Sequence, residues 1–390
     1  MNVTFLHTAD WQLGKPFGGV EDVQKCALLQ NERLAVIRRL GDKARESGAA
    51  FVLVAGDLFD SPHATKATVA AACSAIGSLG IPVFVIPGNH DHGGAGSLWE
   101  QEFFKREQGQ LAPNLNVLLK QEPIELQNAV LFPCPLLRRH ETTDPTTWLR
   151  SSQEFEARFG DKPRIVLAHG SVLNFGSIED DEESDAGTPN LIDLTRLSER
   201  SFDYVALGDW HGTKQVGSKA WYSGTPELDR FVKGGDHNPG NILLVEAIRG
   251  EPPHVECLRT GPIEWHELEF RFSDDNSLAH LKELVDQKIG NRANQDLLWL
   301  HLKGSLGIEP STRLEEMVDA WKARLLRVKL DDQTVIAPSP AELDGLTRRA
   351  SDPLVSLVAT KLVALAAGES EEAAVARIAL RELHAACATR

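Results

Sequence analysis

The chain has 390 residues, of which 42% are hydrophobic and 25% charged, and its formal net charge is -15. This balance is typical of a globular protein and excludes a disordered or fibrous chain. A surface of this charge repels a polyanion, so contact with nucleic acid requires a local basic face, a bound metal or a partner subunit. The first residues lack a signal sequence and no apolar run reaches the length of a bilayer span, which predicts a cytoplasmic protein with no membrane partner.

Short apolar runs alternate with helical sequence through the first two thirds of the chain, a pattern typical of a layered α/β domain. Five runs indicate buried strands, each followed by polar residues: 3–6, 51–54, 82–86, 165–168 and 203–207. Residues 26–46 have the apolar spacing of an amphipathic helix that ends at Gly48. Alternating segments over 241–248, 254–258 and 263–270 predict antiparallel strands that complete a sheet.

The predicted boundary of this first domain lies close to Phe272, which gives a domain over residues 1–272. Residues 273–334 alternate again between helical and strand-like sequence, which predicts a small α/β module. Residues 335–390 are expected to hold a proline-containing linker over 335–346 and a helical C-terminal region from Pro353. The acidic run Glu179 to Asp185 is expected to be a solvated surface loop.

The polar residues that follow the five predicted strands are rich in metal-binding side chains. They are Asp10-Trp11-Gln12, Gly56-Asp57, Gly88-Asn89-His90-Asp91, His169-Gly170 and Gly208-Asp209-Trp210-His211. In open α/β sheets, ligands bind outside the carboxyl ends of the strands, where these residues would converge. Each group alone also fits a common turn, and a lone histidine such as His169 is more often structural. Five groups in order favour a site that holds two divalent cations.

In this order the groups resemble the motifs of the calcineurin-like metallophosphoesterases: Asp-x-His, Gly-Asp, Gly-Asn-His-Asp/Glu, His and Gly-His-x-His. Four stretches are more narrowly similar to the SbcD-type DNA-repair nuclease subunits, including the YhaO-like bacterial exonucleases: 7–11, 54–60, 87–91 and 222–227. The resemblance implies an α/β fold, a layered metallophosphoesterase β-sandwich flanked by helices. It also implies that residues 273–334 form a capping domain, followed by a helical C-terminal tail.

The resemblance assigns a role to each motif residue. Asp57 would bridge two metals, one also held by Asp10, Gln12 and His211 and the other by Asn89, His169 and Asp209. A hydroxide between the cations would attack phosphorus in line, and His90 would stabilise or protonate the leaving oxygen.

Gln12 and Asp209 depart from the family pattern, because the family usually has histidine at both positions. Ligands rich in oxygen favour Mn²⁺, or Mg²⁺, over Zn²⁺. A neutral amide is a weak ligand, so one site is expected to be labile or filled only with substrate. The alternative is a decayed site kept as a scaffold.

Several residues beside the motifs have two interpretations. His92 would bind substrate phosphate or lie in a surface loop, and Asp60 would border the substrate or cap the following helix. Basic residues near the motifs would contact phosphate or be ordinary surface charges; they are Lys15, Arg138, Arg139, Lys214 and Arg230. Trp11 and Trp210 are expected to pack beside the metals.

Together these features favour a metal-dependent DNA nuclease that hydrolyses phosphodiesters in DNA end processing and repair. The resemblance implies two protein partners: an SbcC-type SMC-like ATPase, docked through the helices after Pro353, and a second copy in a homodimer. Those helices equally fit packing on their own domain. Two other functions remain open, a phosphoesterase for small phosphodiesters, which the acidic charge favours, and a weakly active scaffold subunit.

Overall fold

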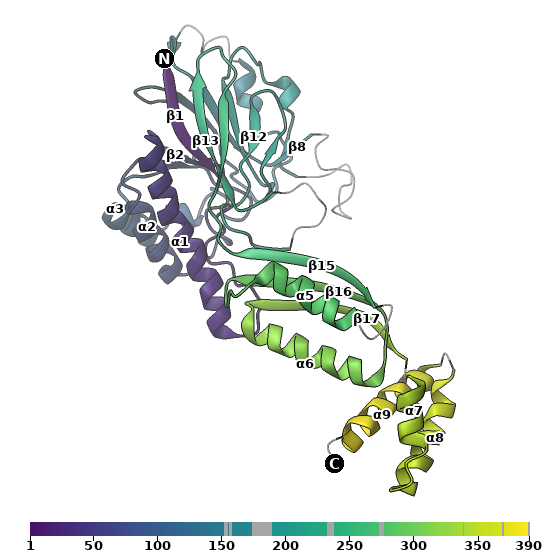
Figure 1. Ribbon diagram of the computed structural model, residues 1–390. Helices are drawn as coiled ribbons and strands as arrows, with labels where there is room; N and C mark the ends of the chain where they lie inside the picture. The colour runs from purple at the N-terminus through teal and green to yellow at the C-terminus, as the bar shows by residue number, and fades with distance from the viewer. Residues whose placement is uncertain are drawn as a thin grey trace. The chain divides into compact units, whose positions relative to one another are not determined.

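A computed structural model describes residues 1–151, 155, 158–173, 189–231, 238–272, 277–337, 339–368 and 370–388. The chain divides into two compact units, Met1–Ile263 and Glu264–Arg390 (Figure 1). The acidic run predicted as a surface loop, 179–185, lies outside the described residues. Among the helices in the described ranges, none has the length and apolar character needed to cross a membrane.

The first unit contains a six-stranded sheet in the order β14-β13-β1-β2-β3-β4. Four neighbouring strands run parallel: β1 (Asn2–Thr8), β2 (Val52–Val54), β3 (Val83–Val85) and β4 (Leu115–Val117). Strands β13 (Asn241–Ile248) and β14 (His254–Arg259) extend this sheet in antiparallel fashion, as predicted.

Three helices cover the outer face of this sheet: α1 (Val23–Ser47), α2 (Lys66–Gly77) and α3 (Glu102–Leu111). The predicted helix is confirmed in α1. Asp22 caps its first turn by accepting from the N–H groups of Gln24 and Lys25, and Gly48 ends it with a φ of 66°. Apolar residues on one stripe of each helix pack against alternate residues of β1, β2 and β3, which forms one core layer.

A second six-stranded sheet has the order β11-β12-β10-β7-β6-β5. Its strands are β5 (Ile124–Glu125), β6 (Val130–Cys134), β7 (Arg164–His169), β10 (Tyr204–Gly208), β11 (Lys214–Gln215) and β12 (Ala220–Tyr222). The four strands β6, β7, β10 and β12 run parallel. Buried residues from both sheets, such as Phe5 and Leu167, form the core between them, so the predicted helix-flanked β-sandwich is confirmed.

Shorter elements complete the first unit. Strands β8 (Ser171–Val172) and β9 (Leu191–Ile192) form a small sheet after β7. Single 3₁₀ turns lie at η1 (Leu98–Glu100), η2 (Thr147–Ser151) and η3 (Leu194–Arg196). Residues beside the last two help to cover the outer face of the second sheet.

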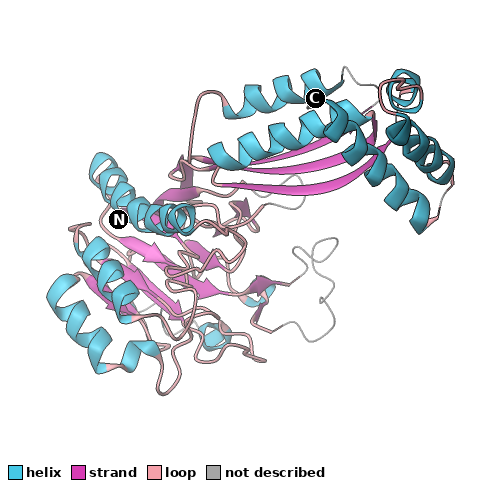
Figure 2. Cartoon of the chain, turned by 90° about the horizontal axis from the view of Figure 1, so that it is seen from below, coloured by secondary structure: helices cyan, strands magenta, loops and turns pink. Residues whose placement is uncertain are grey.

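The second unit begins with a parallel sheet of β15 (Glu264–Phe272), β16 (Asp296–Leu306) and β17 (Arg327–Ile336). Helices α5 (Ser277–Ile289) and α6 (Ile308–Arg324) cover one face of this sheet (Figure 2). The prediction that 263–270 completes the first sheet as an antiparallel strand is therefore wrong. Because β15 pairs with β16, the division after Ile263 lies one strand before the boundary predicted at Phe272.

Three helices follow this sheet: α7 (Pro340–Thr347), α8 (Pro353–Ala366) and α9 (Glu371–Ala388). They confirm the predicted helical C-terminal region, and they share a small core with the first residue of α6, built from Ile308, Leu346, Ala359 and Leu380. Much of the segment expected to be a linker is regular structure. Strand β17 continues to Ile336, and α7 starts with a capping box in which Ser339 and Glu342 bond each other's backbone N–H groups.

Candidate metal centre

Sharp turns at the carboxyl ends of the strands set the direction of the predicted ligands. Asp10, Gln12, Asp57 and Asp209 have φ values of 54°, 41°, 54° and 104°, a left-handed region that non-glycine residues adopt at a cost of about 1–3 kcal/mol each. The turns after β1 and β2 support each other. The N–H of Asp10 donates to the carbonyl of Gly56 at 3.1 Å, and the N–H of Gln12 donates to that of Asp57 at 2.9 Å.

Asp10, Asp57 and His169 form a buried cluster in which one ligand atom from each lies within 4.8 Å of the other two. The Nε2 atom of His169 is 3.7 Å from Oδ1 of Asp57 and 3.7 Å from Oδ1 of Asp209. It is also 3.3 Å from Oδ1 of Asn89. Five of the predicted ligands therefore meet where the two sheets end, and the cluster is consistent with divalent metal ions.

Close backbone packing holds His169 and Asp57 in place. The Nδ1–H of His169 donates to the carbonyl of Ala55 at 2.8 Å, which turns Nε2 toward the carboxylates. A Cβ atom on Gly56 would lie 2.2 Å from Nδ1 of His169, and one on Gly88 would lie 2.1 Å from Oδ1 of Asp57. Glycine at these two motif positions is thus required by the side chains packed against it.

The charges of the cluster also suit a cation. Burial raises the pKa of Asp10 to about 6, although His211 and His169 act in the opposite direction. Burial by itself would lower the pKa of His169, but the charges of Asp57, Asp10 and Asp209 raise it to about 9. Metal ligands bind in their deprotonated forms, so a divalent cation would take over the role of a proton in balancing these carboxylates.

Gln12 and His211 lie beside the cluster, and their side chains contact each other and Lys15 or Asp229. Gln12 places its amide nitrogen 3.4 Å from Nε2 of His211, while its amide oxygen accepts from Lys15 Nζ at 2.6 Å. Because an ammonium group only donates, the atom that faces Lys15 is the oxygen. The oxygen with which Gln12 would bind a metal is therefore engaged by Lys15.

A buried carboxylate that the sequence did not single out, Asp229, completes this arrangement. Its Oδ1 is 3.0 Å from Nδ1 of His211, and its Oδ2 accepts from Lys15 Nζ at 2.8 Å. Although burial acts in the opposite direction, the charges of His211, Lys15 and Arg230 hold the pKa of Asp229 well below its usual range. A carboxylate at Nδ1 fixes the histidine tautomer that leaves Nε2 available as a metal ligand.

His90, in the loop after β3, and Asp60, in the loop after β2, border the cluster. The backbone N–H of His90 donates to Oδ1 of Asp57 at 2.9 Å, and its Nδ1 lies 2.8 Å from the carbonyl of Asp60. The carboxylate of Asp60 is 3.8 Å from Lys15 Nζ. Thr65, rather than Asp60, caps α2, so the capping interpretation of Asp60 is wrong.

His92 is half-buried, and within the described part of the chain its Nδ1 atom has no hydrogen-bond partner. The residue is not a member of the buried Asp/His cluster found among the described residues. Trp11 is fully buried and donates from Nε1 to Oγ1 of Thr8 at 2.9 Å, which is the packing role expected of it.

Two further buried residues support the motif loops. Asp91, quoted within the third motif but given no role, accepts from the N–H groups of Gly88 at 2.7 Å and Phe59 at 3.0 Å, and burial raises its pKa to about 7. Arg33 of α1 donates to the carbonyls of Trp11 at 2.8 Å and Asp10 at 3.2 Å. The sequence feature that points to Asp91 is its position directly after His90. The feature that points to Arg33 is a basic residue between the apolar positions of the helix.

The two sheets, their helices and the Asp/His cluster define a metal-dependent phosphoesterase. Residues 3–213, more than half of the chain, match the family described as calcineurin-like phosphoesterase. The chain belongs to this family, as its motifs predicted.

Similar proteins are distant. The SbcD subunit of the SbcCD nuclease from Staphylococcus epidermidis is 24% identical over 221 residues, which cover 53% of this chain and 56% of that protein. The chain thus spans about half the length of this curated relative. A crystal structure of a protein from Thermus thermophilus is 14% identical, with a TM-score of 0.40, and covers 66% of this chain and 100% of that one. A structural likeness of that size carries no argument about function.

Proposed function

We propose that the chain is a DNA nuclease that hydrolyses phosphodiester bonds at DNA ends with divalent cations. The observation that carries this proposal is the buried cluster of Asp10, Asp57 and His169, with Asn89 and Asp209 beside it. The local similarity to a nuclease subunit supports DNA as the substrate. The proposal also gives the chain a place in DNA end processing and repair.

The side chains would act as follows. Asp10, Asp57, Asn89, His169 and Asp209 would hold a cation, and the many oxygen atoms in this set suit Mn²⁺ or Mg²⁺. When bound, the metal activates water and neutralises charge on the phosphate. His90 bonds the Asp60 carbonyl through Nδ1–H, which leaves Nε2 to stabilise or protonate the leaving oxygen.

A second cation would bind between Asp57 and His211 with lower affinity. Binding through Gln12 requires its amide oxygen to leave Lys15, and its amide nitrogen to leave Nε2 of His211. The loss of both contacts would weaken the binding of a metal on this side. The two sites are therefore unequal, and the Gln12 side is filled at higher metal concentration.

The test is degradation of linear DNA by the purified chain with Mn²⁺. Replacing Asp57 with asparagine, or His90 with alanine, should reduce the rate at least about 100-fold, in line with the loss of a metal ligand or of proton transfer. Asp319→Asn is a matched control because that carboxylate is exposed in the second unit. DNA cleavage that survives both site substitutions would contradict the proposal.

Hydrolysis of a small phosphodiester is the second candidate, favoured by the net charge of -15. The same preparation separates the two functions when it is offered linear DNA and an aryl phosphodiester in parallel. Hydrolysis of the aryl ester without any cleavage of DNA would favour this candidate. A scaffold role requires that neither substrate is hydrolysed, whether or not the chain binds Mn²⁺.

We further propose that the C-terminal helices dock an SMC-like ATPase subunit. Leu354 and Leu357 of α8 are 70% and 56% exposed, and Val375 and Ile378 of α9 are exposed as well. Apolar side chains in this number at a surface favour a partner over solvent. Leu354→Glu with Leu357→Glu should abolish copurification of the ATPase, whereas Thr360→Glu on the same helix should not.

The predicted homodimer is tested by the mass of the purified chain in light scattering.

A further inference from the structure

An open surface cavity, of about 640 Å³, lies in the first unit at the edge of the sheet away from the metal centre. Arg164 lines it and begins β7, while His169 ends the same strand. At roughly 3.3 Å per residue, the two ends of β7 are separated by about 16 Å. The cavity is therefore distinct from the phosphoesterase site.

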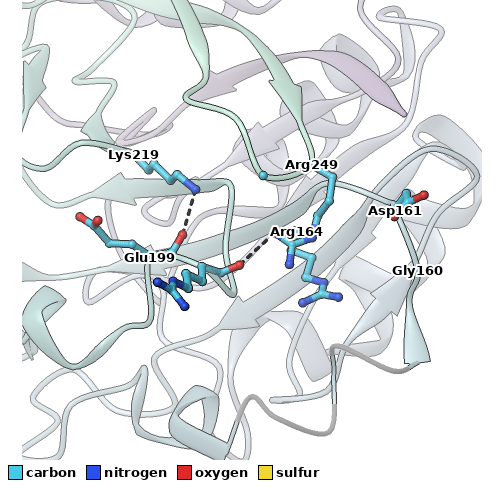
Figure 3. Close-up of a pocket in the computed structure, with 8 residues that line it drawn as sticks. Gly160, Asp161, Arg164, Glu199, Lys219 and Arg249 are labelled. Carbon is cyan, nitrogen blue, oxygen red and sulfur yellow. Dashed lines mark hydrogen bonds between the residues drawn. The ribbon is translucent and has the colours of Figure 1, made fainter.

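Basic side chains dominate the interior of this cavity. Arg164, Lys219 and Arg249 line it (Figure 3), and so does the exposed Arg200. The side chains of Lys219 and Arg249 are only 17% and 18% exposed, and Arg164 is buried. In a chain with a net charge of -15, this is a local concentration of positive charge.

One buried carboxylate, Asp203, lies among these groups. Its Oδ1 accepts from Arg249 Nη1 at 3.0 Å and from the N–H of Gly250 at 2.8 Å, and Lys219 Nζ is 3.9 Å away. Its Oδ2 accepts from the backbone N–H of Arg164 at 2.8 Å. Asp203 carries one negative charge and faces two positive ones, so it does not balance Lys219 and Arg249 together.

Carbonyl oxygens, which carry no net charge, hold the basic groups in position. Lys219 Nζ donates to the carbonyls of Glu199 at 2.9 Å and Phe202 at 3.0 Å, and Arg249 Nη1 donates to that of Arg200 at 3.0 Å. The two acidic residues that line the cavity, Asp161 and Glu199, are exposed, and the carboxylate of Glu199 points away from Arg249 (Figure 3). Lys219 and Arg249 are thus fixed in place, and only one described carboxylate, that of Asp203, contacts the two of them.

We propose that this cavity binds a phosphate group, either as the free ion or as the phosphate of a mononucleotide. Lysine and arginine donors held in fixed positions are the usual ligands of a phosphate dianion. The volume lies within the range of small-molecule sites and leaves room for a nucleoside beyond the phosphate. The proposal does not depend on the nuclease function, since it uses none of the metal-centre residues.

The test is calorimetric titration of the full chain with inorganic phosphate, and separately with a deoxynucleoside monophosphate, after divalent metals have been removed with EDTA. Both ligands should bind saturably at one site per chain, and the nucleotide should bind more tightly. Arg200→Gln should weaken phosphate about 3- to 10-fold, in line with the loss of one charged donor. Arg200 is exposed, so the variant should unfold at the same temperature as the parent.

Arg249→Met should abolish phosphate binding, and Arg348→Gln, an exposed arginine in the second unit, should leave it unchanged. Unaltered phosphate affinity in Arg200→Gln and in a folded Arg249→Met would overturn the proposal. So would an absence of binding by both small ligands, or binding only of duplex DNA to these arginines.

Discussion

Replacing Asp229 with asparagine perturbs the His211 side of the metal centre without adding volume. In the parent chain this carboxylate is almost fully buried and contacts Nδ1 of His211 at 3.0 Å and Lys15 Nζ at 2.8 Å. Asparagine retains one acceptor oxygen but carries no charge, so it cannot serve both partners. The substitution therefore affects both the fold and the binding of metal.

Both effects can be estimated from these contacts. Removing one partner of a buried ion pair costs about 3–5 kcal/mol. The Lys15 side chain is 22% exposed and retains its hydrogen bond to Gln12, so we expect a loss of about 2–3 kcal/mol in the free energy of unfolding. Loss of the carboxylate that orients a metal-binding histidine should lower Mn²⁺ affinity at the His211 site about 10- to 100-fold.

Urea unfolding and calorimetric titration with Mn²⁺ measure the two effects separately, with Asp319→Asn as the exposed control. Adding Lys15→Met to Asp229→Asn removes the ammonium that has lost its buried carboxylate partner, so the double variant should regain part of the stability. If Asp229→Asn unfolds and binds Mn²⁺ like the parent chain, the role assigned to this carboxylate is refuted.

Three further substitutions test separate parts of the account. In Gly88→Ala, the new Cβ would lie 2.1 Å from Oδ1 of Asp57, so Mn²⁺ binding should be lost at a cost in stability of about 1–3 kcal/mol; parental Mn²⁺ affinity would be inconsistent with this packing. Burial lowers the pKa of His7 to about 3, below its unfolded value, so its neutral form stabilises the fold above about pH 6.5. That stability is lost as the pH falls toward 3, by up to about 1.4 kcal/mol per pH unit. The free energy of unfolding of His7→Gln, measured in urea, should therefore depend less steeply on pH than that of the parent chain, and an unchanged slope would contradict the role of His7. Gln12→His restores the imidazole usual in the family and should tighten the weaker site and raise its Zn²⁺ affinity, and titrations identical to those of the parent would argue against two unequal sites.

The strand ends were predictable because buried parallel strands are continuous apolar runs, and the polar residues that follow them stand out in the sequence. Asp10, Asp57 and His169 come from separate runs, yet the ends of parallel strands meet at one edge of a sheet. The convergence of these residues therefore followed from the strand pattern together with the family motifs.

The partners of these residues were not predictable, because they depend on contacts that exist only in the folded chain. Lys15 and Asp229 are far apart in the sequence, and only the folded chain shows that Lys15 contacts both Asp229 and the amide oxygen of Gln12. The pairing of strand β15 was wrongly predicted for a similar reason. The residues of β15 indicate a strand, but they do not show which strand it pairs with. Its neighbour is β16, which follows the intervening helix α5 in the chain and runs parallel to β15.

Anomalous diffraction at the manganese edge, from crystals of the full chain soaked in Mn²⁺, tests the central claim most directly. We predict a strong peak between Asp10, Asp57 and His169, and a weaker one between Asp57 and His211 that grows with Mn²⁺ concentration. A map with no peak at the Asp10, Asp57 and His169 cluster, under conditions in which the chain hydrolyses a phosphodiester, would contradict the account.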